Sequence, residues 1–289
     1  MKRQGYALLV VVAVLGALSV AAGVAALAAQ TSTAGARADL DQARYRAAIE
    51  AGAARAAIGL SRDAENEPWI ADGRAYRFEL DGLDVTIRPL AESGRFDLNQ
   101  GDSETLQRLL VALDIDRRDA LTISGALPDW RDGDDDRSQN GAEAPAYRSS
   151  GTPPPANRPF LAVEEFRRVL GVTADIYEAA VPYLTIDGTQ SVAAHYAPPT
   201  LLASLDRPGG DAQRILAARQ SGGALAEVDD GGETGNRYAI FVEVESPSGG
   251  ALARIITVIL PGENGVMDVL RRTPVAVGEA QRFLEPDAN

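Results

Sequence analysis

The chain has 289 residues, enough for one large domain or two ordinary ones, and its 28 basic and 41 acidic side chains give a formal charge of −13. This charge repels phosphate backbones, so we expect no nucleic-acid partner, whereas divalent cations suit it. There is no cysteine, and the single histidine, His195, excludes a metal site built from several histidines.

The first segment is an apolar run from Tyr6 to Ala29 that contains no charged side chain and follows Lys2, Arg3 and Gly5. As a helix it would be roughly 36 Å long, enough for a hydrocarbon core of about 30 Å. The two basic residues predict that this end stays in the cytoplasm and that the rest of the chain lies on the other side of the membrane.

Three interpretations of this run stay open on the N-terminus alone. A secretory signal peptide would use the A-x-A pattern Ala26-Leu27-Ala28, and a plain membrane anchor would need only the apolar length. A short basic leader that ends in glycine before a long apolar helix also resembles the signal of type IV pilins and pseudopilins. In that family a prepilin peptidase cuts after the glycine and methylates the new N-terminus, here Tyr6.

From Thr31 to about Ser61 the abundance of Ala, Arg and acidic residues predicts that the helix continues. Apolar residues that recur at three- and four-residue steps are expected to face inward, and they are Leu40, Ala43, Ala47, Ala51, Ala54 and Ile58. The segment is either a spacer helix or the outer half of one long helix that packs on a sheet. Both interpretations predict the same inward face.

Four segments alternate apolar and polar residues as half-buried strands do. They are 76–80 and 85–90, joined by a turn at Asp81-Gly82, and 238–246 and 251–260, joined by 247–250. Residues 266–271 are a candidate last strand, and the tail from 285 is expected to fray. The order of strand pair, helical block and strand pair predicts an α+β fold with one antiparallel sheet and a helical insertion.

Between the strand pairs, helical patterns alternate with Pro and Gly. Ser103 is the expected N-cap of a Leu-rich helix, and Asp119 to Trp130 is expected to form a second helix. A helix over 163–172, stopped by Gly171, and a helix that begins at Thr173 would form a helix-hairpin-helix unit. Some such units bind DNA phosphates, but the acidic charge of this chain favours a packing role.

The segment 129–143 is the richest in oxygen ligands. If Asp132 is position 1, then Asp134 and Asp136 fall at positions 3 and 5 and Glu143 at position 12, which is the ligand spacing of an EF-hand calcium loop. Arg137 replaces the glycine of position 6, so the curl of the loop must differ. A solvated acidic loop is the other interpretation, and we favour Ca2+ because crowded carboxylates without a cation are unfavourable.

Several short segments follow the leader in a characteristic order. They are Gly94-Arg95-Phe96-Asp97-Leu98-Asn99, Asp129-Trp130-Arg131-Asp132, Gly141-Ala142-Glu143 with Tyr147 beyond, Asn157-Arg158-Pro159-Phe160, the hairpin 165–173, and Pro182-Tyr183-Leu184-Thr185. This ordered set resembles the type II secretion minor pseudopilin K family, GspK, over nearly the whole chain.

The resemblance implies a pilin-like fold, in which a long N-terminal helix packs on an antiparallel sheet, with a large helical insertion that contains helix-hairpin-helix (SAM-like) units and binds calcium. Its parts would be a leader at 1–5, a transmembrane helix at 6–29, a pilin-like helix and sheet at 30–95 and 233–289, and the insertion at 96–232. Gly5 and Tyr6 would form the processing site. The expected Ca2+ ligands are Asp132, Asp134, Asp136 and Glu143, and the role of the ion would be structural.

The resemblance also implies a place at the tip of the pseudopilus, in complex with minor pseudopilins I and J and near H. The chain would be a single-pass protein of the bacterial inner membrane, processed by the prepilin peptidase, with its C-terminal domain in the periplasm and exported substrates as further candidate partners. We expect a structural subunit and no enzyme.

Some residues depart from the family pattern. Ala144 stands where the family often has Asp, and Ala193 and His195 replace two asparagines of a stretch of the form V-N-V-N-T-A-P. Val10 takes the place of the Glu that most pilins carry at mature position 5, where it can neutralise the amine of a neighbouring subunit. A tip subunit with no neighbour above it needs no such Glu, although Val10 is equally well explained as a membrane-facing residue.

Two other functions stay open. One is a membrane-anchored or secreted calcium-binding interaction domain that is not part of a pilus. The other is a hydrolase that uses a pair of carboxylates, but the sequence places no such pair in a cleft.

Overall fold

The computed structural model describes residues 4–61, 69–205, 211–220, 235–247, 249–260 and 267–277. Its contacts divide the chain into two units, Met1–Ala48 and Ile49–Asn289. The predicted basic leader residues Lys2 and Arg3, the tail from residue 278 and the predicted end of the insertion at 232 lie outside the described residues. The α+β class with an N-terminal helix and an antiparallel sheet is confirmed.

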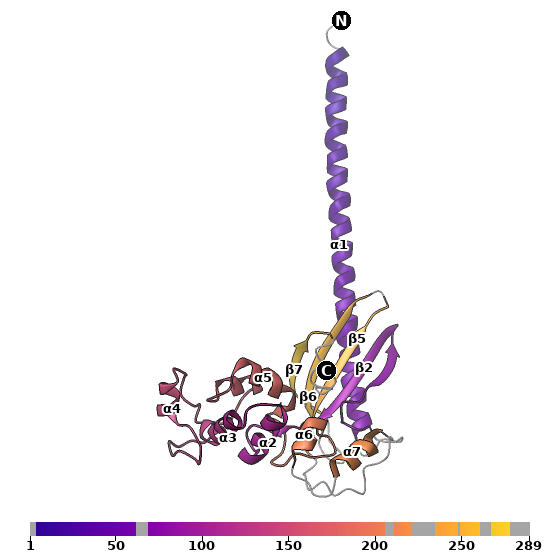
Figure 1. Ribbon diagram of the computed structural model, residues 1–289. Coiled ribbons are helices and arrows are strands. Elements are labelled where there is room, and N and C mark those ends of the chain that lie inside the picture. The colour runs from indigo at the N-terminus through magenta and orange to yellow at the C-terminus, as the bar shows by residue number, and fades with distance from the viewer. Residues whose placement is uncertain are drawn as a thin grey trace. The chain divides into compact units, whose positions relative to one another are not determined.

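The first element is the helix α1, Gln4–Leu60, which is drawn in indigo and purple in Figure 1. Within the described residues, one segment of it, Val10–Leu27, is long and apolar enough to cross a membrane, with a mean hydropathy of 2.5 and none of its residues buried. A lone Ser19 hydroxyl in this span donates to the Leu15 carbonyl, so the helix satisfies it internally. The predicted apolar span is therefore helical.

The prediction of which residues of α1 face inward was wrong, because the buried face is rotated about the helix axis from the predicted one. Leu40 and Ile58 are 64% and 68% exposed, whereas Ile49, Ala53 and Ala56 are buried. The reason lies at Gly52, where an added Cβ would stand 2.7 Å from Val242 Cγ1 on the sheet. Small residues at 52, 53 and 56 let the helix approach the strands closely, so backbone proximity and not apolar size selects the face.

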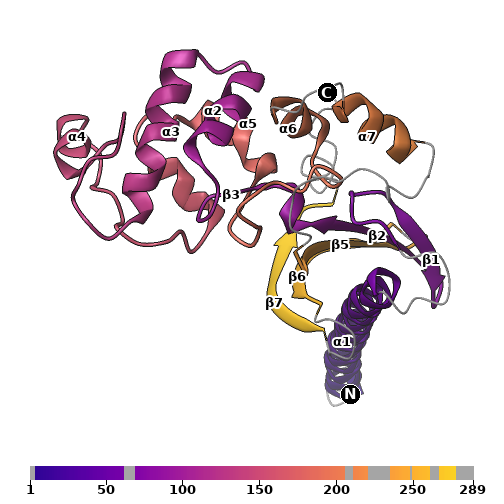
Figure 2. The same cartoon turned by 90° about the horizontal axis from the view of Figure 1, so that it is seen from below.

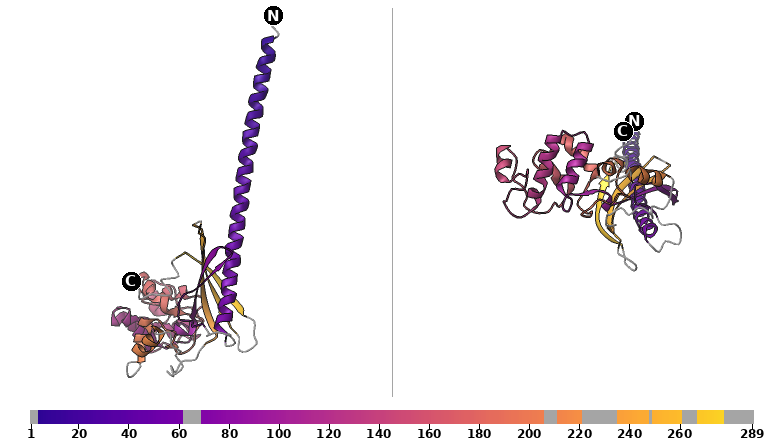
Figure 3. Two further views of the ribbon diagram at one scale, coloured as in Figure 1. Left: turned by 90° about the vertical axis from the view of Figure 1, so that its right-hand side faces the viewer. Right: turned by 60° about the horizontal axis from the view of Figure 1, so that its bottom comes forward.

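The sheet has five antiparallel strands in the order β1-β2-β5-β6-β7. Their bounds are Tyr76–Leu80, Leu83–Ala91, Arg237–Glu245, Ala251–Ile259 and Asp268–Val275. The last strand begins two residues later than predicted and runs four residues further. Figure 3 shows the strands running alongside the final turns of α1.

The first hairpin turns on two residues, Asp81 and Gly82, whose φ angles of 52° and 72° are both in the left-handed region. Paired positive φ angles define the type I′ turn that matches the twist of two strands, and Asp-Gly favours it. Cross-strand pairing then runs from Leu80 with Leu83 to Tyr76 with Ile87.

The chain leaves the sheet after β2 and returns to it at β5, and we call the described residues between them (92–205, 211–220 and 235–236) the helical insertion. Its elements are η1 Glu92–Gly94, β3 Phe96–Asp97, α2 Ser103–Ala112, α3 Arg117–Arg131, α4 Ala144–Ser149, η2 Val163–Arg168, α5 Ala174–Ala180, η3 Val181–Tyr183, β4 Leu184–Thr185, α6 Pro199–Ser204 and α7 Asp211–Gln220. Figure 2 shows α2, α3, α4 and α5 gathered beside the sheet. They share one core around Trp130, Leu109 and Phe166, all fully buried.

Local structure in the insertion corrects two predictions and adds one unpredicted feature. Asp102, not Ser103, caps α2, because its carboxylate accepts the Thr105 amide at 2.8 Å. The segment over 163–172 forms the 3₁₀ helix η2, which ends at Arg168 with Val169 as its C-cap and not at Gly171. Gly171 (φ 91°) lies in the turn before α5, and Thr173 caps α5 as expected. Strands β3 and β4 pair in parallel as a small second sheet that the sequence did not predict.

Candidate functional site

The acidic loop predicted to bind a cation connects α3 to α4. Asp132 is the C-cap of α3 and Glu143 is the N-cap residue of α4. The Glu143 side chain makes no capping hydrogen bond, so it does not serve its own helix. The two ends of the predicted ligand set are thus held by the ends of two helices.

Buried carboxylate oxygens without partners mark this loop. Both Glu143 oxygens and Asp132 Oδ1 are buried and have no hydrogen-bond partner within the described part of the chain, and Glu143 is only 6% exposed. A buried carboxylate without a donor is strongly unfavourable unless a cation or a proton neutralises it. The position therefore fits a hard cation.

The electrostatics of these groups agree with that fit. Burial raises the pKa of Glu143, and the neighbouring charges of Asp129, Asp132 and Asp135 raise it further. Burial also raises the pKa of Asp132, together with Asp134 and Asp129. Each of these two carboxyl groups has a raised pKa because it is buried and because other carboxylates lie close by, and a bound cation would relieve both effects.

Asp129 belongs to this group, and the sequence analysis did not select it as a ligand. It is fully buried on α3, and its carboxylate accepts the Ser138 amide at 3.1 and 3.3 Å. A Cβ at position 141 would overlap Asp129 Oδ2, so Gly141 is required for this close approach. In the sequence, Asp129 is an acidic residue two positions before the end of the helix, and such a residue is equally typical of an exposed helix surface.

The middle of the loop is more open. Asp134 and Asp136 are exposed, and Asp134 Oδ1 accepts the Asp136 amide at 2.9 Å. Arg137, the departure from the EF-hand pattern, turns its side chain back onto the loop and donates to the Gly141 carbonyl at 2.7 Å. Asn140 has a φ of 61°, so the left-handed backbone conformation in this loop occurs at Asn140 and not at Arg137, which occupies position 6 of the EF-hand pattern.

Asn157 connects the acidic loop to a later segment. Its Nδ2 donates to the Asp134 carbonyl at 3.1 Å, and its Oδ1 is buried without a partner among the described residues. Amide oxygens are common Ca2+ ligands. No three Asp, Glu or His side chains in the described ranges already stand in a coordinating arrangement, so binding an ion would need side-chain rotation.

A buried aromatic cluster lies beside the α3 end of the loop. Trp130 packs against Tyr147 and Phe160, with ring centroids 6.1 and 5.8 Å away. The Tyr147 hydroxyl accepts the Leu170 amide at 3.1 Å, and burial raises the pKa of Tyr147 to about 12. These aromatic side chains lower the local polarity, and a carboxylate beside them therefore needs a counter-charge.

The predicted processing site and the two departures from the family pattern at Ala193 and His195 lie outside the acidic loop. Gly5 and Tyr6 are in the first turns of α1, far in sequence from any polar cluster. The stretch that contains Ala193 and His195 is held by Arg219, whose guanidinium donates to the carbonyls of Ala194 and Ala197 at 2.7 and 2.8 Å. Burial lowers the pKa of Arg219.

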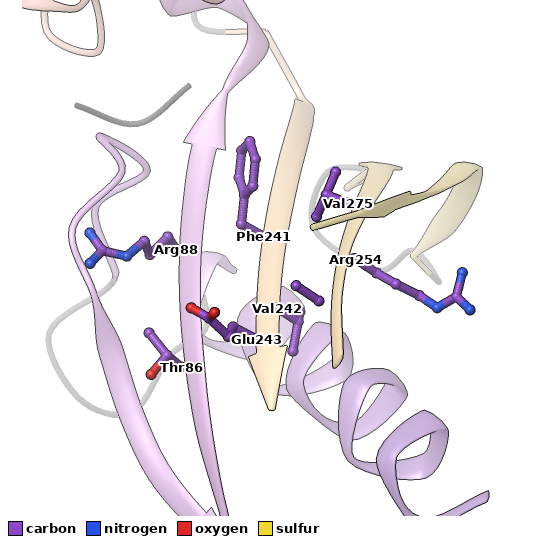
Figure 4. A pocket seen from close by; sticks show the side chains of 8 residues that line it. Thr86, Arg88, Phe241, Val242, Glu243, Arg254 and Val275 are labelled. Carbon is purple, nitrogen blue, oxygen red and sulfur yellow. The ribbon is translucent and has the colours of Figure 1, made fainter. Parts of the chain in front are cut away.

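Two hollows lie on the surface of the described part of the chain. The first, shown in Figure 4, lies on the sheet beside Thr86, Arg88 and Glu243, and its volume of about 10 Å³ admits one water at most. The second, about 390 Å³, lies at the start of α2 beside Asp102, Arg108 and Gln190. In the second hollow, Asp102 and Arg108 already hold partners in α2, so these two charged side chains are not free to bind a ligand.

Residues 77–189 match the family model described as "Type II secretion system (T2SS), protein K". The chain is 26% identical over 156 residues to the type II secretion system protein K of Aeromonas hydrophila, a match that covers 50% of this chain and 47% of that protein. It is 31% identical over 149 residues to that of Pectobacterium carotovorum subsp. carotovorum, covering 43% and 45%. The chain thus spans about half the length of the curated relatives it matches.

Among solved structures, a chain of the GspK-GspI-GspJ complex from the type 2 secretion system of enterotoxigenic Escherichia coli has a similar fold. The TM-score is 0.55 at 18% identity, and the likeness covers 82% of this chain and 98% of the other. At this identity the likeness establishes the fold alone.

Proposed function

We propose that this chain is a minor pseudopilin at the tip of the type II secretion pseudopilus, because residues 77–189 match the model of the type II secretion system protein K family. There it forms a complex with minor pseudopilins I and J and lies near H. This complex initiates or caps the pseudopilus during protein export across the outer membrane. The observation that carries the proposal is the match to the protein K model over residues 77–189, which include β2 and much of the helical insertion, in a chain whose sheet follows a long apolar helix. The partners I and J are suggested by the composition of the similar solved complex.

The membrane arrangement follows from the apolar helix and the family. Val10–Leu27 spans the bacterial inner membrane once, and the C-terminal domain lies in the periplasm. The prepilin peptidase cuts between Gly5 and Tyr6. Exported substrates meet the insertion at the tip, and its helix-hairpin-helix, SAM-like units serve as packing modules and not in catalysis.

Calcium is part of the proposal. Asp132 and Glu143 bind the ion, supported by their buried oxygens without partners, and Asp129 and Asn157 stand beside them. Asp134 and Asp136 complete the set that the spacing predicts. Bound Ca2+ would supply positive charge that lets these carboxylates stay ionised while buried, and the loop would thereby be fixed to α3 and α4.

Intact-mass and N-terminal peptide analysis of the protein from its native membranes tests the proposal. A chain that begins at N-methylated Tyr6 supports a pseudopilin, and a Gly5→Leu variant should keep the leader. A chain that begins near Ala29 or Gln30 is a signal-peptidase product. That result would replace the pseudopilin with a secreted calcium-binding interaction domain outside any pilus.

A further inference from the structure

The helical insertion is connected to the sheet through two adjacent strands, and Arg74, just before β1, also donates to the Arg219 carbonyl of α7 at 3.5 Å. The two ends of the insertion leave and re-enter the sheet on adjacent strands, because Ala91 at the end of β2 pairs with Tyr238 near the start of β5. Two adjacent connections define a line about which a body can rock. Contacts away from that line are therefore needed to fix the insertion in one orientation.

Asp187 makes such a contact from the insertion. Its Oδ1 accepts Arg237 Nη1 at 3.4 Å, and its Oδ2 accepts Arg271 Nη2 at 2.8 Å. Arg237 begins β5, but Arg271 lies on β7, two strands further along the sheet. With strands about 4.8 Å apart, Arg271 extends to Asp187 from a strand whose backbone lies roughly 10 Å from β5, so the carboxylate is held from two directions.

The loop that carries Asp187 is braced from within the insertion. The Asp187 amide donates to Thr185 Oγ1 at 3.0 Å, and the Thr185 hydroxyl donates to Glu92 Oε2 at 2.6 Å. The next residue, Gly188, donates its amide to Asp97 Oδ2 at 2.7 Å. Because Glu92, Asp97 and Thr185 are buried, these hydrogen bonds fix the position of Asp187 relative to the rest of the insertion.

We propose that Asp187 is a positioning residue that fixes the helical insertion in a single orientation on the sheet. The Asp187 side chain is only 14% exposed, while its arginine partners are 40% and 45% exposed. Half-exposed arginines contribute little to overall stability, so the effect of the ion pairs is on orientation. This role is independent of membrane processing and of calcium.

The absence of cysteine allows a direct test, because spin labels can be placed at two introduced cysteines. Glu79→Cys on β1 and Asp119→Cys on α3 are both at exposed positions. Pulsed electron paramagnetic resonance on the full chain in detergent then measures the distance between sheet and insertion. The parent should give one narrow distribution, and Asp187→Asn should broaden it at least twofold or add a second population.

Glu50→Gln is the matched control, since it breaks a similar pair with Arg272, the neighbour of Arg271, without involving the insertion. Its distribution should match the parent. Arg271→Gln, which leaves Asp187 paired with Arg237, should broaden the distribution by less than Asp187→Asn. An unchanged width in both Asp187→Asn and Arg271→Gln, with folding verified by circular dichroism, would overturn the proposal.

Discussion

Asn99 holds the backbone of Phe160 through both atoms of its side-chain amide. Oδ1 accepts the Phe160 amide at 2.7 Å, and Nδ2 donates to the Phe160 carbonyl at 3.1 Å. These contacts imitate a strand pair across 61 residues and seat the buried Phe160 ring against Trp130. A single polar side chain thus connects the β3 segment to the wall of the acidic loop.

Asn99→Ala should destabilise the protein by roughly 1–3 kcal/mol, because it leaves the amide and carbonyl of Phe160 without partners in a partly buried position. Urea unfolding measures the change. Gln139→Ala, at an exposed loop position, is the control and should have almost no effect. Equal stability of the two variants would contradict the role of Asn99.

Gly52→Leu should destabilise the packing of α1 on the sheet by about 1–3 kcal/mol or more, because even a Cβ at this position approaches Val242 Cγ1 to 2.7 Å. Gly35→Leu is the control, since nothing lies within 4 Å of a Cβ there. Its better helix propensity should leave stability unchanged or raised. Thermal unfolding of the full chain in detergent compares them, and a Gly52→Leu variant as stable as the parent would contradict the close approach.

Calcium at about 10 mM should stabilise the protein by roughly 1.4–2.7 kcal/mol, if the affinity is that of extracellular calcium modules, and a chelator should remove the gain. The Asp132→Ala/Glu143→Ala double variant should lose the response. Glu79→Ala/Asp84→Ala removes the same charge from exposed positions on the sheet and should keep it. Thermal melting with and without Ca2+ measures the gain in stability. If Asp132→Ala/Glu143→Ala is still stabilised by Ca2+, these two residues are excluded as ligands.

Asp102→Ala should cost about 1 kcal/mol at pH 7 through loss of the α2 cap, and Asp102→Asn less, because an amide oxygen still caps. Burial alone would raise the pKa of Asp102, but hydrogen bonds from the Thr105 amide and hydroxyl hold that pKa below its ordinary value. The folded pKa is thus the lower one, so this stabilisation is present above about pH 3.9, the unfolded value, and is lost as the pH falls through the folded pKa.

The stability difference between the parent and Asp102→Asn should therefore shrink below about pH 3.9. Guanidinium unfolding at several pH values measures it. A difference that stays constant across this range would mean that the carboxylate charge adds nothing to the cap.

Local patterns determined much of this protein. The apolar run, the Asp81-Gly82 hairpin, the strand pairs and the α3 helix follow from short-range periodicity and turn chemistry, which the sequence displays directly. The acidic loop was found by spacing, because alternate carboxylates and the flanking helices are local features. The family resemblance rested on the same short segments.

Only the tertiary structure decided which face of α1 is buried. Gly52 and Ala53 are buried because the sheet lies so close to the helix that only small residues fit there, and not because these residues are hydrophobic. It likewise added Asp129 to the cluster around Glu143, and it joined Asp187 to arginines 50 and 84 residues away. Burial, long-range charge pairing and the pairing of β3 with β4 depend on which distant segments meet. The sequence sets the periodicity of each element, whereas these contacts arise only when the elements pack.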